Sequence, residues 1–258
     1  MKTKRFFNRL HTQTGASLIE LLISMAIGLV ILIALGYFFL GSRQINRTTD
    51  DVSRMQESGR NALEIIGKAV RQAGYRSEYN TINSVPLKNA SGMVVTALSG
   101  VDGASNAPDS ITVNYESQQG YLVSGVSAGG ETNCTGSAVG AGVNNTVLLT
   151  YAFAVTGTAL TCNGTVVVDN IEDMQIDYGI YTTTPGVVSS YITAPTAAQL
   201  AQIVAVRVSL LVRGPSINTT TNGRQTYTYN GVQVVSADGY LRQVYAATFT
   251  VRNQSEGS

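Results

Sequence analysis

The side chains that could do chemistry in this chain form two small groups. Cys134 and Cys162 offer a disulfide or two free thiols, and Glu172, Asp173 and Asp177 place three carboxylates close together. Asp173 and Asp177 would share one face of a strand, because successive side chains alternate between faces. A carboxylate pair or a calcium site is one interpretation. Solvated charges at a strand edge are the simpler one.

Histidine chemistry is nearly absent. The only histidine, His11, lies in an N-terminal segment, residues 1–15, that we expect to be removed. Without it, Ser-His-Asp and Cys-His catalysis and histidine-based metal sites are excluded. The chain also lacks a Gly-x-x-x-x-Gly-Lys-Ser/Thr phosphate loop and a His-Glu-x-x-His motif. We therefore expect that this protein is not an enzyme and that it binds no metal ion and no cofactor.

The two cysteines favour a disulfide, because an even count is typical of exported chains. Closing a loop of about 29 residues would stabilise the fold by roughly 3.5 kcal/mol in the chain-entropy model. The alternative is a pair of buried free thiols.

The chain is organised around a long apolar run. Leu21–Ser42 carries no charge between Glu20 and Arg43. As a helix, this run would span the ~30 Å hydrocarbon core of a bilayer, so we predict a transmembrane segment at about 18–40. Glu20 lies at the N-terminal end of the run, where burying a charge in lipid is energetically costly. It either has a partner there or reaches the headgroup level and water.

The residues before the apolar run are basic. Lys2, Lys4, Arg5 and Arg9 precede Glu20, with no acidic residue among them. A secretory signal would have a shorter apolar core followed by a cleavage site, so an uncleaved anchor is indicated. The positive charge predicts a cytoplasmic N-terminus and an exported remainder.

The order Gly15-Ala16-Ser17-Leu18-Ile19-Glu20, followed by the apolar run, resembles the class III signal of type IV pilins and type II secretion pseudopilins. The resemblance implies that a prepilin peptidase cuts between Gly15 and Ala16 and methylates the new amine of Ala16. It also implies that Glu20 of one subunit pairs with the amine of a neighbour and sets register in a filament. Ala16 stands where the family usually has Phe.

Residues 43–75 read as a continuation of the helix in water. Apolar and small residues recur at steps of three and four: Val52, Met55, Gly59, Ala62, Ile66, Ala69 or Val70, and Ala73. Charged residues fill the other face, which predicts an amphipathic helix packed on a head. Gly74 is its predicted stop signal.

Four further segments narrow the resemblance to PilW-type minor pilins. They are 54–63, the closing Ala73-Gly74-Tyr75, 203–213 with Arg207 and Arg213, and Asp238-Gly239-Tyr240-Leu241-Arg242 followed by 251–253. Residues 80–165 carry no such resemblance. By alternation alone, Arg207 and Arg213 would be solvated charges on a half-buried strand.

Beyond residue 75, short runs rich in Val, Ile, Thr and Tyr alternate with Gly, Asn, Ser and Asp. The predicted strands are 93–97, 110–115, 146–155, 165–168, 174–181, 203–212, 227–229 and 242–251. Residues 124–145 and 185–195 are predicted loops, and 194–202 a short helix. One long helix followed by strands predicts an α+β fold, and the resemblance implies that this fold is pilin-like, with an antiparallel sheet.

The predicted organisation has three parts. Residues 1–15 form a leader, 16–75 the long helix, and 76–258 a periplasmic or extracellular β-rich head. Removing the leader takes away four of the 17 basic residues and leaves the 16 acidic ones in the majority. A mildly acidic chain argues against a broad nucleic-acid footprint.

We therefore predict a minor pilin that helps to initiate a type IV pilus and lies at its tip, in support of motility, adhesion or DNA uptake. It would be a single-pass inner-membrane precursor with a periplasmic head, and later part of the pilus. Its expected partners are the major and other minor pilins, the prepilin peptidase and the inner-membrane assembly platform, with nucleic acid only through DNA uptake. The alternatives are a minor pseudopilin of type II secretion and an exported adhesin or DNA-uptake module.

Overall fold

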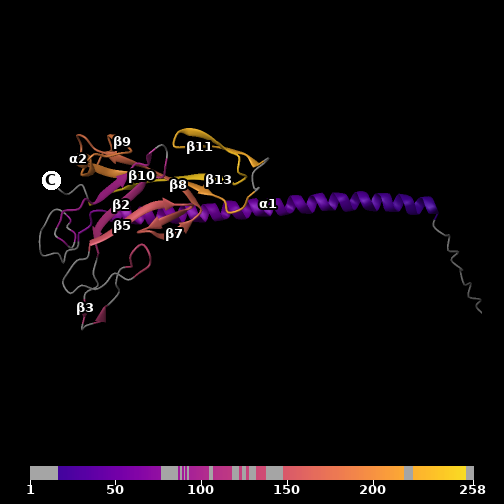
Figure 1. Ribbon diagram of the computed structural model, residues 1–258, viewed down its shortest axis with the longest axis horizontal. Coiled ribbons are helices and arrows are strands. Elements are labelled where there is room, and N and C mark those ends of the chain that lie inside the picture. The colour runs from indigo at the N-terminus through magenta and orange to yellow at the C-terminus, as the bar shows by residue number, and fades with distance from the viewer. Residues whose placement is uncertain are drawn as a thin grey trace, which may run out of the picture. The chain divides into compact units, whose positions relative to one another are not determined.

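A computed structural model describes residues 17–76, 87, 89, 91, 93–104, 107–117, 122–123, 126–127, 132–137, 148–217 and 223–253. The chain divides into two compact units, Met1–Arg47 and Thr48–Ser258. Helix α1, Leu18–Gln72, supplies the described part of the first unit and opens the second (Figure 1).

In the first unit, α1 is an apolar helix whose side chains are open to their surroundings. Its Leu, Ile, Met, Val and Phe side chains between Leu18 and Leu40 are more than half exposed. Among the described helices, α1 alone is long and apolar enough to cross a membrane, by length and composition.

The second unit is the head, and its strands form two larger antiparallel sheets. The first sheet has the order β1-β2-β5-β6-β7 and the second β13-β10-β8-β9. The strands of the first are β1 Leu98–Val101, β2 Ser110–Glu116, β5 Leu148–Thr156, β6 Ala159–Cys162 and β7 Thr165–Asp169. Those of the second are β8 Ile171–Ile180, β9 Ser190–Ile192, β10 Ile203–Arg213 and β13 Arg242–Thr250.

Three smaller elements complete the described head. β11 Gln225–Tyr229 and β12 Val232–Ser236 form a hairpin, seen in yellow above β13 in Figure 1. β3 Leu122–Val123 pairs with β4 Val126–Ser127, and α2 is a single turn, Ala197–Leu200.

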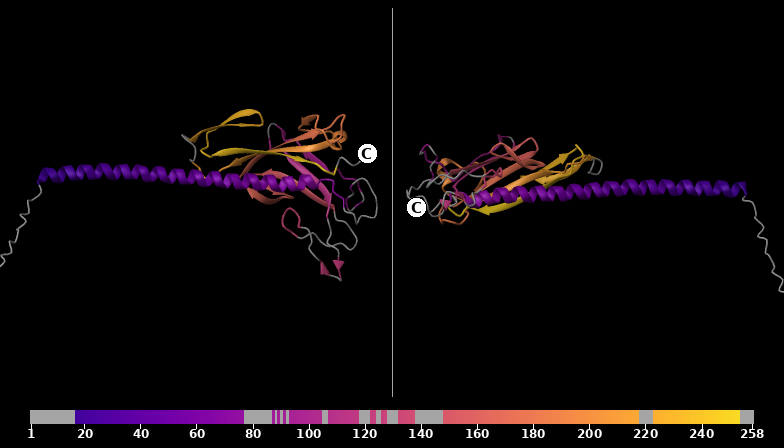
Figure 2. Two further views of the ribbon diagram at one scale, coloured as in Figure 1. Left: turned by 180° about the vertical axis from the view of Figure 1, so that it is seen from behind. Right: turned by 90° about the horizontal axis from the view of Figure 1, so that it is seen from below.

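The core forms where α1 meets both sheets. Met55, Ala62, Ile66 and Val70 of the helix, with Ala73 directly after it, are buried with strand residues of each sheet in one apolar cluster. The strand β13 runs along this half of α1 in both views of Figure 2. The predicted amphipathic face is therefore the packing face, and the α+β pilin-like fold is confirmed.

The helix ends where Gly74 predicts. Gly74 adopts φ +74°, a left-handed conformation that glycine favours at helix ends. Its N–H donates to the Asn114 carbonyl at 2.9 Å, and the Asn253 amide donates to the Ala73 carbonyl at 3.2 Å. The end of α1 is thus tied to β2 of the first sheet and to the segment that follows β13.

Some sequence expectations were wrong. The strand predicted at 93–97 begins instead at Leu98, because Leu98 is buried and pairs with Val113 whereas Met93 and Val94 are exposed. Strands β3, β4, β6, β9 and β12 were not predicted, and β4 and β9 lie in segments that were predicted as loops. Asp51 lies on the buried face of α1, where only apolar residues were expected.

Candidate assembly site and the disulfide of the head

Glu20 lies in the first turn of α1. Its N–H and that of Leu21 donate to the Ser17 carbonyl at 3.0 and 3.2 Å, and the Ser24 hydroxyl donates to the Glu20 carbonyl at 2.7 Å. The Glu20 side chain is exposed, and a negative charge in a first helical turn is favoured by the helix dipole. The structure therefore leaves this carboxylate accessible to a partner.

The rest of the predicted processing site, Gly15 and Ala16, lies outside the described residues. Cleavage after Gly15, methylation of Ala16 and pairing of Glu20 with an amine stay predictions.

The exposed apolar helix also has small positions. A Cβ atom added at Gly28, Gly36 or Gly41 would meet nothing within 4 Å in this structure. Small residues allow close approach of neighbouring helices. Since an exposed apolar helix of this length is unfavourable in water, its surface must be covered by lipid or by other protein.

The first helical residues of the head are fixed by Asp51. Its carboxylate accepts hydrogen bonds from the Ser216 N–H at 3.2 Å and the Ser216 hydroxyl at 2.9 Å. Asp51 is buried, and a buried carboxylate needs such donors. The contact ties α1 to the connection that follows β10.

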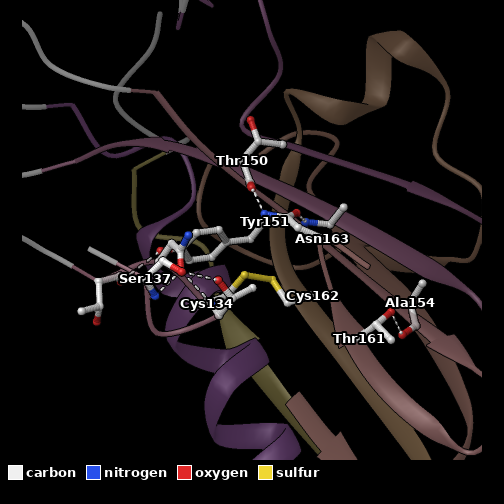
Figure 3. The surroundings of a disulfide bond; sticks show 12 residues. Cys134, Ser137, Thr150, Tyr151, Ala154, Thr161, Cys162 and Asn163 are labelled. Atoms are coloured by element: carbon white, nitrogen blue, oxygen red, sulfur yellow. Dashed lines mark hydrogen bonds between the residues drawn. A yellow bond between two sulfur atoms is a disulfide. The ribbon is translucent and has the colours of Figure 1, made fainter. Parts of the chain in front are cut away.

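Cys134 and Cys162 form a disulfide, with their Cα atoms 6.2 Å apart (Figure 3). Cys162 lies fully buried on β6, whereas Cys134 is half-buried in the segment 132–137. The bond therefore joins this segment to the interior of the first sheet, as the even cysteine count predicts.

Polar contacts support the segment around Cys134. The Asn133 side-chain oxygen accepts hydrogen bonds from the Thr135 N–H, the Thr135 hydroxyl and the Ser137 N–H at 2.7–3.0 Å. Tyr151 of β5 donates to the Thr132 carbonyl at 3.4 Å, and the Tyr115 hydroxyl donates to that of Tyr151 at 2.9 Å. The disulfide and the Tyr151 hydrogen bond together attach residues 132–137 to the first sheet.

The segment Asp238-Gly239-Tyr240-Leu241-Arg242 forms a charge cluster at the start of β13. The Arg242 side chain is only 6% exposed, and its guanidinium donates hydrogen bonds to the Glu172 carboxylate of β8 at 2.5 and 2.8 Å. The guanidinium also donates hydrogen bonds to the Asp238 carboxylate at 2.6 and 2.8 Å. Hydrogen bonds from Arg242 lower the pKa of Asp238 to about 2, and those with Asp238, followed by those with Glu172, raise the pKa of Arg242.

Arg213 joins the same cluster. Its guanidinium lies 4.4 Å from the centre of the Tyr240 ring and 4.0 Å from Glu172. The expectation of solvated arginines was therefore wrong for Arg213, which is half-buried. Arg207 is exposed, but it pairs with Asp177 at 3.0 Å and lies over Tyr191.

The carboxylates singled out in the sequence are separated by these pairings. Asp177 lies opposite Arg207 in the β8–β10 register, and Glu172 belongs to Arg242. Asp173 accepts from the Gln175 amide at 3.1 Å, and its pKa is raised mainly by burial. Within the described ranges, no group of three or more His, Cys, Asp or Glu could hold a metal ion.

Residues 125–129 read Gly-Val-Ser-Ala-Gly, the pattern of a nucleophile elbow. An elbow is a turn between a strand and a helix and needs a histidine partner. Ser127 instead belongs to β4, which pairs with β3, and the only histidine is His11. The pattern is therefore coincidental.

The exposed apolar helix, its packed second half and the antiparallel head define a pilin-like protein. The family model described as Type IV Pilus-assembly protein W matches residues 138–253. This range covers less than half of the chain and contains the segments 203–213, 238–242 and 251–253. The match confirms the resemblance to PilW-type pilins over this part of the chain.

Other comparisons add less. No curated protein sequence matches the chain. Among solved structures, the type IV-like pilin TTHA1219 from Thermus thermophilus is 14% identical, covers 81% of this chain and 97% of its own, and has a TM-score of 0.42. At that similarity, the assignment of the fold depends on this chain's own helix and sheets.

Proposed function

We propose that this protein is a minor pilin that helps to initiate a type IV pilus and occupies its tip. One observation carries the proposal: the exposed first half of α1, uncharged from Leu21 to Ser42 and with the Glu20 carboxylate in its first turn, continues into a head that matches the PilW family model. Such a helix is stable in a membrane or in the apolar interior of a filament. Transfer from one to the other is what assembly requires.

Processing supplies the partner for Glu20 in this proposal. A prepilin peptidase cuts after Gly15 and methylates Ala16, which leaves a cationic amine at the end of an apolar helix. An unpaired charge in an apolar environment is energetically costly, and a carboxylate next to a protonated amine lowers this cost for both groups. Glu20 of one subunit then pairs with the amine of a neighbour and fixes the axial register between them.

The partners are the other minor pilins, the major pilin and the inner-membrane assembly platform. The precursor has a cytoplasmic N-terminus and a periplasmic head. The family match is to a pilus-assembly protein, which favours a pilus over a type II secretion pseudopilus.

The experiment is complementation of a strain that lacks this gene, with pili sheared from the surface and quantified. The intact chain restores pili, whereas Glu20→Ala restores few or none. Ser53→Ala, on the exposed face of α1 in the head, is the matched control and restores them fully. Normal piliation with Glu20→Ala would contradict the proposal.

A further inference from the structure

The strand β13 forms one edge of the second sheet of the head. In the sheet order β13-β10-β8-β9, β13 pairs with β10 on one side and with no described strand on the other. Its nine residue pairs with β10 run without a register shift. No charge and no proline occur from Gln243 to Val251. Edge strands with these properties readily accept another strand.

The other outer strands of the two larger sheets are protected. β9 has three residues and β1 has four, which is too short for extended pairing. β7 has five residues, ends in Asp169 and pairs with β6 across a register shift. Short strands, charges and irregularities are the ordinary protections of a sheet edge. β13 has none of them beyond Arg242.

The hydrogen-bond pattern shows which groups of β13 face outward. The N–H of Val251 donates to the Val204 carbonyl, and the Leu241 carbonyl accepts from the Gly214 N–H. In an antiparallel pair, alternate residues direct both backbone groups toward the partner. The backbone N–H and C=O groups of the odd-numbered residues of β13 therefore point toward β10, and those of the even-numbered residues point away from it.

The first outward position confirms this alternation. The Arg242 N–H donates to the side-chain oxygen of Gln225 at 2.6 Å, and the Arg242 carbonyl accepts from the Gln225 amide at 2.7 Å. Gln225 thus stands in for one residue of a neighbouring strand. The next outward positions, Val244, Ala246, Thr248 and Thr250, bond to no such group within the described part of the head.

The side chains along the edge indicate what kind of strand would fit. On the inner side, Tyr245 and Phe249 are half-buried against α1 at Gly59 and Gly67. On the outer side, Ala246, Thr248 and Thr250 are exposed. An added strand would extend both surfaces, so it needs apolar side chains toward α1 and polar ones away from it.

We infer that the outer edge of β13 binds an extended, uncharged strand of about seven residues from the head of a different pilin, with alternating apolar and polar side chains. Backbone groups of Val244, Ala246, Thr248 and Thr250 supply the hydrogen bonds, as in strand addition to other sheet edges. This inference rests on the proposed function, because it assumes assembly with other pilins.

The direct test is photo-crosslinking in cells that assemble pili. A benzophenone amino acid replaces Thr248 in the full-length chain, and the crosslinked peptide is identified by mass spectrometry. The expected adduct joins Thr248 to an uncharged, alternating segment of another pilin. The same probe at Thr228, exposed on the β11–β12 hairpin, is the control and gives no such adduct. An adduct to a helix, an adduct between two copies of this chain, or no adduct would overturn the inference.

A proline substitution tests the backbone contact itself. Ala246→Pro removes one outward N–H without removing a β10 hydrogen bond, a place where edge strands tolerate proline. It should lower the yield of the Thr248 adduct by about tenfold, whereas Ala246→Ser should leave it unchanged. If Ala246→Pro does not fold, Thr250→Lys places a charge on the exposed side of the edge and should give the same loss.

Different results would contradict strand addition at β13 and the proposed pilin function. If Ala246→Pro and Thr250→Lys crosslink and assemble normally while Glu20→Ala abolishes pili, strand addition is wrong and the pilin function stands. If Glu20→Ala also assembles normally, the proposed function is wrong as well.

Discussion

Gly59 of α1 and Tyr245 of β13 are in such close contact that a Cβ atom at position 59 would lie 2.6 Å from the Tyr245 ring. Eight residues further along the helix, Gly67 faces Phe249 in the same way, with the ring Cζ 2.7 Å from an added Cβ. Two glycines on one face of the helix thus receive two aromatic rings of the edge strand. This packing sets how closely β13 approaches α1.

Gly59→Ala should therefore destabilise the head. Overpacking of this kind costs about 1–3 kcal/mol, which outweighs the gain of up to about 1 kcal/mol from replacing a helical glycine. Thermal unfolding of the full-length chain in detergent measures the effect. Gly41→Ala is the control, because a Cβ atom there meets nothing. Equal melting temperatures for the two variants would show that the Gly59–Tyr245 contact is not rigid.

Glu172→Gln should be destabilising. Arg242 is buried and would keep only Asp238 as a charged partner, but Glu172 is 26% exposed, so we expect a loss of about 1–3 kcal/mol. Denaturant unfolding measures the loss. Asp177→Asn breaks the more exposed pair with Arg207 and should cost less than about 1 kcal/mol. Similar losses for the two variants would mean that Arg242 is solvated on removal of Glu172.

Asp238 should make the head less stable in acid. Its pKa is lowered to about 2 in the folded protein, whereas an unperturbed Asp titrates near 3.9. The folded state therefore favours the ionised form, which adds stability above about pH 4 that is lost as pH falls through about 2. The melting temperature measured from pH 5 to pH 2 should fall less for Asp238→Asn than for the parent chain. Parallel curves would contradict this assignment.

Loss of the disulfide should cost stability once, whichever cysteine is removed. Cys134→Ala, Cys162→Ala and the double variant should each lose about 3.5 kcal/mol in the chain-entropy model. The Cys162 variants should lose somewhat more because Cys162 is buried in the first sheet. Denaturant unfolding under oxidising conditions compares them. Additive losses in the double variant would mean that the two side chains act separately.

The helix and most strands could be predicted from the sequence because their signals are local. The apolar run, the three- and four-residue steps and Gly74 each depend on neighbouring residues. Strands β6 and β12 carried a local signal too: Asn163-Gly164 and Asn230-Gly231 adopt positive φ in two-residue hairpin turns. The first dipeptide marks the end of β6 and the second the start of β12.

The contacts that define the head could not be predicted in this way. Glu172 and Arg242 are 70 positions apart, and Asp51 and Ser216 are 165 apart. Their meeting depends on the register of β8, β10 and β13 and on where α1 crosses the sheets. A sequence shows that these residues are charged or polar, but their partners follow only from the assembled fold.

The central claim is that this chain is processed and used as a pilin. Intact mass and N-terminal sequencing of the protein from membranes, with and without the prepilin peptidase, test it most directly. The account predicts a mature chain that begins at methylated Ala16 only when the peptidase is present. A chain that still begins at Met1 in both strains, or one cut beyond Leu40, would contradict it.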